Sequence, residues 1–186
     1  MGIQYTASYC NVGSKLRTVK GSTCATCYAM RGKYPIPVVN DALERRYASL
    51  DNPEWANAMA HMINTLDIAH FRWHDSGDVK SVAHLTQIVE VARMTPNTEH
   101  WLPSREYQIV EDYLDTGTVP DNLVIRTSAP MVDGPAVSVR GLPTSTVIRH
   151  TEPDTFICQS KSRGNRCGSC RACWNPDIPN VAYPWH

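Results

Sequence analysis

The sequence lacks net charge, long apolar runs and a recognisable leader. Lys plus Arg number 18 and Asp plus Glu number 18, so the formal net charge is zero. Balanced charge argues against a protein that coats nucleic acid or binds a membrane through a basic surface. No apolar run approaches the roughly 20 residues that span a bilayer, and the first residues, Met1 to Tyr5, do not resemble a signal peptide. We therefore expect a soluble, intracellular protein that enters no membrane.

The motifs of several common enzyme classes are also missing. The sequence contains no GxGxxG or GxxxxGK[ST] loop for phosphates, no HExxH helix and no GxSxG elbow. Nucleotide hydrolysis, zinc-protease and serine-hydrolase chemistry are therefore not supported. Cysteine, in contrast, is abundant, with seven residues. Reducing conditions disfavour structural disulfides, so clustered thiols in such a protein more often bind metal or do redox chemistry.

The chain of 186 residues, 42% of them hydrophobic, suits a single domain over 1–186. Residues 1–36 contain cysteines and show no periodicity, residues 37–155 form the core, and residues 156–186 are rich in cysteine again. In the core, helical periodicity alternates with short apolar runs. Four helices are predicted: residues 38–50, a helix capped by Asn52 that ends at 66, a helix capped by Ser81 that ends at 92, and residues 109–114. Five strands are predicted: residues 68–73, a strand that ends at 103, and residues 123–127, 136–140 and 146–148.

Strands that recur every 25 to 30 residues with a helix between them indicate βαβ units. We predict an α/β fold, either an incomplete (β/α) barrel or an open parallel sheet, with cysteine-rich irregular segments at both ends. Functional residues in such folds gather in the loops after the strands. Here these loops are 74–78, 104–105 and 128–130.

The strongest signal for a metal is the run Cys167-x2-Cys170-x2-Cys173, with Cys158 upstream. Ferredoxins use C-x2-C-x2-C with a more distant cysteine to bind a [4Fe–4S] cluster. A four-cysteine Zn2+ site is the alternative, although it usually separates two C-x2-C pairs. Unliganded core thiols are disfavoured, because basic residues surround these cysteines.

A second pair, Cys24-x2-Cys27, is less specific, because it suits a zinc half-site, two cluster ligands or a redox pair. In one arrangement, Cys158, Cys167, Cys170 and Cys173 hold a cluster and the pair acts separately. In the other, both ends of the chain share one cluster. Spacing alone does not choose between them. Cys10 stands apart, and we expect it to be a buried small hydrophobe.

Polar side chains follow the first two predicted strands. His74, Asp75 and Asp78 could supply a general base, a metal ligand or a clamp for a polar substrate. The alternative is a polar turn in which an aspartate caps the next helix. Arg105 could bind a carboxylate or phosphate, or pair with one of these aspartates. These four residues are the catalytic candidates.

Several motifs together resemble the gene-product-88-like family of small phage proteins. They are Gly13-Ser14-Lys15-Leu16, Cys27-Tyr28-Ala29, Gly32-Lys33-Tyr34, Arg72-Trp73-His74-Asp75-Ser76-Gly77-Asp78 and Cys167-x2-Cys170-x2-Cys173-Trp174. The resemblance implies a phage-encoded metalloprotein, with an iron–sulfur centre, acting in the host bacterial cytoplasm, and it supplies no established reaction. A partial barrel with cysteines near its start is also similar to radical S-adenosylmethionine enzymes, but their C-x3-C-x2-C signature is absent.

Two functional hypotheses follow. The first is a [4Fe–4S] protein with a partial barrel, whose cluster does redox or radical chemistry on a small-molecule substrate near the strand ends. The second is a non-enzymatic module, stabilised by zinc or a cluster, that binds a host protein or nucleic acid through the basic stretch from Lys161 to Arg171.

Overall fold

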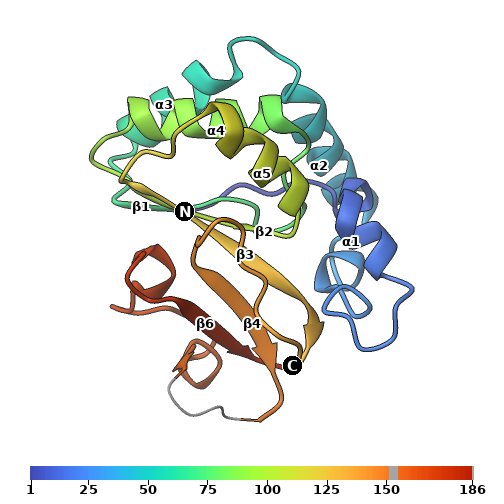
Figure 1. Ribbon diagram of the computed structural model, residues 1–186. Coiled ribbons are helices and arrows are strands. Elements are labelled where there is room, and N and C mark those ends of the chain that lie inside the picture. The colour runs from blue at the N-terminus through green and yellow to red at the C-terminus, as the bar shows by residue number, and fades with distance from the viewer. Residues whose placement is uncertain (151–154, 186) are drawn as a thin grey trace.

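A computed structural model describes residues 1–150 and 155–185 and contains one parallel sheet. Its six strands lie in the order β1-β2-β3-β4-β6-β5, and the sheet curls into a half-barrel (Figure 1). The predicted α/β fold with a parallel sheet is confirmed. The strands are β1 His70–Arg72, β2 Glu99–Ser104, β3 Leu123–Val132, β4 Thr144–Ile148, β5 Phe156–Ile157 and β6 Asn180–Pro184.

The helices cover one face of this sheet. They are α1 Asn11–Leu16, α2 Pro37–Ser49, α3 Trp55–Thr65, α4 Val82–Met94 and α5 Tyr107–Thr116. Helices α3, α4 and α5 lie together over the β1–β3 part of the sheet (Figure 1). Among the described residues, none of the helices has the length and apolarity needed to cross a membrane. Helix α1 and the loop that follows it meet the carboxyl ends of β2 and β3, where Val12 bonds to Glu106 and Thr23 bonds to Pro130.

The helical periodicity explains which side chains are buried on this face. In α3, Trp55, Met59 and Ile63 are buried, as predicted, whereas Met62 and Leu66 are exposed. The cap that the sequence predicts for α4 is confirmed, since Ser81 Oγ accepts a hydrogen bond from the His84 N–H at 3.2 Å.

Two local predictions are wrong. Asn52 does not occupy the cap position of α3, because the helix begins at Trp55 and Glu54 precedes it directly. The Asn52 side chain instead accepts a hydrogen bond from the Glu54 N–H. Residues 136–140 do not form a strand. They follow Gly134 and Pro135, Ser138 Oγ donates to the Leu142 carbonyl at 2.8 Å, and Arg140 has a φ of 49°. The segment therefore folds as a turn.

The two ends of the chain extend the sheet. At the amino end, the Arg72 N–H donates to the Met1 carbonyl at 2.8 Å, and the Asp75 N–H donates to the Ile3 carbonyl at 2.9 Å. At the other end, β6 inserts between β4 and β5. Strand β6 is not among the strands that the sequence predicts, and its position brings the cysteine-rich segment against the sheet.

That segment packs on the face opposite the helices. A second apolar cluster forms there around Trp101 of β2, Val181 of β6, and Ala172 and Cys173 of the C-terminal segment. Consecutive residues of β2 thus serve different layers, because Leu102 packs in the helix-side core and Trp101 packs against the cysteine-rich segment.

Candidate functional site

The four C-terminal cysteines lie close to one another on the open face of the sheet. Cys158, Cys170 and Cys173 pack in the same apolar cluster, and the Cys170 N–H donates to the Cys167 carbonyl at 3.1 Å, which closes a turn. None of the seven cysteines forms a disulfide. We call Cys158, Cys167, Cys170 and Cys173 the C-terminal quartet.

Cys173 is the buried member of the quartet. Burial raises the pKa of the Cys173 thiol to about 11, while the hydrogen bond with the Tyr183 hydroxyl lowers it and the nearby Cys158 and Cys167 raise it. The Cys173 Sγ and Tyr183 Oη atoms are 3.1 Å apart. Burial also raises the pKa of Tyr183 well above its usual value, so the phenol stays protonated and is able to donate to a thiolate sulfur.

A buried cation holds the quartet's backbone. Arg126, at the centre of β3, is 0% exposed. All of its hydrogen bonds go to backbone carbonyls, at 2.6 to 3.1 Å, and the acceptors are Thr144, Ala172, Cys173, Asn175 and Ile178.

Among residues 1–150 and 155–185, no carboxylate forms an ion pair with Arg126. Burial lowers the pKa of Arg126, and the neighbouring Tyr183 and Cys173 raise it. A buried guanidinium remains charged and favours an anion nearby. Cys173 of the quartet therefore lies beside a buried positive charge, which favours an anion. An arginine in the middle of the apolar run 123–127 was the sequence signal for this feature, and the sequence analysis did not use it.

The N-terminal cysteines form a separate group at the carboxyl ends of β2 and β3. The Cys27 N–H donates to the Cys24 carbonyl at 3.2 Å, and the Thr23 N–H, just before Cys24, donates to the Pro130 carbonyl at 2.9 Å. The sequence suggested that Cys10 stands apart from the other cysteines. In the structure Cys10 lies beside Cys24, with Gly13 next to both side chains. This placement favours the arrangement in which the two ends of the chain act separately.

Within the part of the chain that the structure describes, no three His, Cys, Asp or Glu side chains are arranged to hold a single metal ion. A [4Fe–4S] cluster is a different target, because each of its irons takes its own cysteine. The cysteine ligands of such a cluster therefore surround it from several sides and do not converge on a single metal ion. The residues present fit such a group in their chemistry, since thiolates are the ligands that iron–sulfur clusters and zinc prefer.

The polar residues in the turn after β1 lie in different environments. His74 is buried in the helix-side layer, with its ring centroid 5.4 Å from those of Tyr5 and His84. Burial lowers the pKa of His74 well below its usual value, so the imidazole is neutral. Its burial away from solvent suits a core residue more than a group that meets substrate.

Asp78 connects the turn after β1 to the turn after β2. Its carboxylate accepts hydrogen bonds from the Ser104 hydroxyl at 2.7 Å and from the Arg105 N–H at 2.9 Å. Burial raises the pKa of Asp78, and these hydrogen bonds lower it. The Arg105 guanidinium donates through Nε to the Ala129 carbonyl at 3.2 Å, so Arg105 forms its hydrogen bond to Asp78 through the backbone N–H. The charge of Arg105 also lowers the pKa of Asp78.

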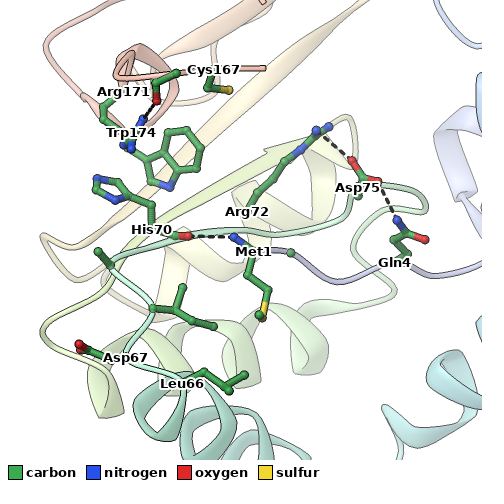
Figure 2. A pocket seen from close by; sticks show the side chains of 14 residues that line it. Met1, Gln4, Leu66, Asp67, His70, Arg72, Asp75, Cys167, Arg171 and Trp174 are labelled. Atoms are coloured by element: carbon green, nitrogen blue, oxygen red, sulfur yellow. Dashed lines mark hydrogen bonds and ion pairs between the residues drawn. The ribbon is translucent and has the colours of Figure 1, made fainter. Parts of the chain in front are cut away.

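Asp75 is the one of these four candidates that lines a cavity of about 620 Å³ beside β1. We call this space the Trp174 cavity. Figure 2 shows Cys167, Arg171 and Trp174 of the C-terminal segment with the His70 ring next to Trp174, and Arg72 and Asp75 farther along the cavity. Arg72 pairs with Asp75 at 3.0 Å, and its guanidinium lies 4.9 Å from the Trp101 ring centre. The cavity thus joins aromatic surface, two cations and one thiol of the quartet.

The basic residues from Lys161 to Arg171 are exposed. Arg171 donates to the Gly168 carbonyl at 2.7 Å and to the Cys170 carbonyl at 2.8 Å, and Lys161 donates to the Trp185 carbonyl at 3.2 Å. These side chains support the fold of their own segment.

Fold and site together define a small α/β half-barrel protein with thiol groups at both ends of the chain. The family known as gene product 88 matches residues 4–176, and the chain belongs to this family of phage proteins. The family resemblance seen in the sequence is therefore confirmed. No curated protein and no solved structure matches the chain. The similarity to radical S-adenosylmethionine barrels stays a prediction.

Proposed function

We propose that this protein is an iron–sulfur protein whose C-terminal quartet binds a [4Fe–4S] cluster in the cytoplasm of the infected bacterium. The observation that carries the proposal is the buried Arg126 beside Cys173. Four thiolates and a [4Fe–4S] core together carry net negative charge, and a buried cation without a carboxylate partner offsets such a charge.

Tyr183 and the backbone support the same role. The Tyr183 hydroxyl lies 3.1 Å from the Cys173 sulfur, and hydrogen bonds to cysteine sulfur tune the reduction potential of a cluster. Arg126 fixes the carbonyls of Ala172 and Cys173, so the backbone that carries the ligands is held to β3. Such rigid support is what a redox centre requires.

The Trp174 cavity is the proposed site for a redox partner of small-molecule size. Cys167 lines the cavity and also belongs to the quartet. A cluster there would supply one-electron chemistry next to the cavity. Arg72 and Arg171 would bind an anionic part of the substrate, and the rings of His70 and Trp174, 5.7 Å apart, offer an apolar wall.

The test compares Cys170→Ser with Asp75→Ala in anaerobically purified protein. Cys170→Ser should lose about four irons per chain together with their visible absorbance. Asp75→Ala, the control on the cavity wall, should keep the metal content of the wild type. Unchanged iron in Cys170→Ser would remove the quartet from the cluster. One zinc per chain without iron would instead support the alternative, a zinc-stabilised module that binds a host protein or nucleic acid.

A further inference from the structure

The segment that carries Cys24 and Cys27 is fixed to the carboxyl end of β3. The Thr23 N–H donates to the Pro130 carbonyl, and the Val132 N–H donates to the Gly21 carbonyl, both at 2.9 Å. Ser22 Oγ donates to the Leu16 carbonyl at 2.6 Å, which ties the segment to the end of α1. These bonds hold the Cys24–Cys27 turn in one place at the functional edge of a parallel sheet.

Cys10 is brought to the same place by a different element. It directly precedes α1, and the Val12 N–H in the first turn of that helix donates to Glu106 Oε1 at 3.0 Å. Glu106 follows β2, the neighbour of β3 in the sheet. Two adjacent strand ends therefore position the three cysteines.

Gly13 lies where the sulfurs meet. A Cβ atom at Gly13 would lie 3.6 Å from the Cys24 sulfur and 3.7 Å from the Cys10 sulfur, and only 2.9 Å from the Cys10 Cβ. The two sulfurs thus face the same small surface on α1. A side chain at this position would crowd the Cys10 side chain, so the glycine keeps the thiols accessible to each other.

The surroundings of the three thiols are polar, and the carboxylates there already have partners. Burial, and after it the neighbouring Asp78, Cys27, Cys24 and Glu106, together raise the pKa of Cys10 to about 12. Asp78 accepts hydrogen bonds from Val79, Ser104 and Arg105, and Glu106 accepts one from Val12. Both carboxylates are therefore committed to holding the loops.

We propose that Cys10, Cys24 and Cys27 bind a second [4Fe–4S] cluster, and that its fourth iron takes a ligand from outside the protein. Sulfur ligands alone select iron–sulfur clusters, zinc or copper(I) over magnesium and calcium. Three cysteines satisfy three irons of a [4Fe–4S] cluster and leave one iron for another ligand. This second site goes beyond the function proposed for the C-terminal quartet.

Arg105 gives the open position a chemical preference. Its Nε–H and the Thr23 hydroxyl donate to the same Ala129 carbonyl, at 3.2 and 3.5 Å, so its guanidinium lies beside the residue that precedes Cys24. Within the described ranges, Arg105 forms no ion pair. A guanidinium in this position pairs with an anionic group. The external ligand is therefore a small anionic molecule.

The experiment separates the two sites by variants of the full-length protein. Wild-type protein purified anaerobically should contain about eight irons per chain, and Cys158→Ser/Cys170→Ser should keep about four of them. Cys24→Ala should lose about four irons while the rest remain. Cyanide, used as a probe for an open iron, should shift the electron paramagnetic resonance spectrum of reduced Cys158→Ser/Cys170→Ser protein.

Three outcomes would overturn this inference. They are loss of all iron from the quartet variant, zinc in place of iron there, and a spectrum that cyanide does not change. Iron that survives Cys24→Ala but not Cys170→Ser would leave only the quartet proposal standing, and the reverse pattern would leave only this one. Circular dichroism of each variant checks folding, and the iron count of the wild-type protein requires no variant.

Discussion

The two faces of the sheet treat buried polar groups in opposite ways. On the helix side, burial lowers the pKa of His84 and His100 to about 4, so both imidazoles are neutral among apolar side chains. On the other side, Arg126 is equally buried and stays charged. One face is therefore built for stability, whereas the other stabilises negative charge. This contrast is the physical basis for our proposal that a cluster binds on the open face.

Replacing Arg126 should have the largest effect. Arg126→Met leaves the carbonyls of Thr144, Ala172 and Cys173 without their donor, and we expect the free energy of unfolding to fall by roughly 3–5 kcal/mol. Iron should be lost as well. Urea denaturation and metal analysis measure the two effects, with Arg45→Met on the exposed side of α2 as the matched control. A stable, iron-loaded Arg126→Met protein would remove the contrast between the faces.

A cavity on the helix face should destabilise the fold without touching the metal. Leu102 is 0% exposed in β2, and Leu102→Ala should lower the free energy of unfolding by about 3 kcal/mol. The iron content per folded chain should stay that of the wild type, because Leu102 points away from the quartet. If Leu102→Ala lost as much iron as Arg126→Met, any destabilisation of the fold would be enough to release the metal.

Acid should weaken the helix face through His100. The pKa of His100 is lowered by burial to about 4 in the folded state, against about 6.5 in the unfolded chain. The unfolded state then binds more protons between these values, so stability falls as the pH drops through this window. Between pH 7 and 5 the loss from His100 is about 2 kcal/mol.

His100→Gln should reduce this pH dependence, as measured by thermal unfolding at the two pH values, and exposed His61→Gln should not. An unchanged pH dependence in His100→Gln would show that His100 is not the neutral, buried group described here.

The smallest effect is expected at the rim of the Trp174 cavity. Asp75 pairs with Arg72 at 3.0 Å, and both side chains are more than one-third exposed. Asp75→Ala should change the free energy of unfolding by less than about 1 kcal/mol. Denaturant unfolding measures this, with Asp51→Ala at the exposed Lys80 pair as a control. A loss of several kcal/mol would mean that this rim supports the fold.

The sequence predicts those parts of the fold that depend on local periodicity. Helices α3 and α4 and strand β3 are visible as repeats of apolar residues, because burial of one face needs only neighbouring residues. Strand β6 is short, lies beside prolines and follows the cysteine-rich segment. Its pairing with β4 is set by contacts far along the chain, so periodicity did not reveal it.

The candidate site likewise has one part that the sequence predicts and one part that it does not. The spacing of Cys167, Cys170 and Cys173 places them in one compact segment, and the structure agrees. The position of Cys10 and Cys24 at the strand ends rests on the bonds of Val12 to Glu106 and of Thr23 to Pro130, whose partners are far along the chain. His74 looked available in a polar turn, but the packing of Tyr5 and His84 around its ring is visible only in three dimensions.

The content of iron and acid-labile sulfide in anaerobically purified wild-type protein tests the central claim most directly, when visible absorbance is recorded on the same sample. The C-terminal quartet alone accounts for about four irons per chain, with equal sulfide and a brown colour. The account predicts at least this amount. Colourless protein that contains one zinc per chain, and neither iron nor sulfide, would contradict it.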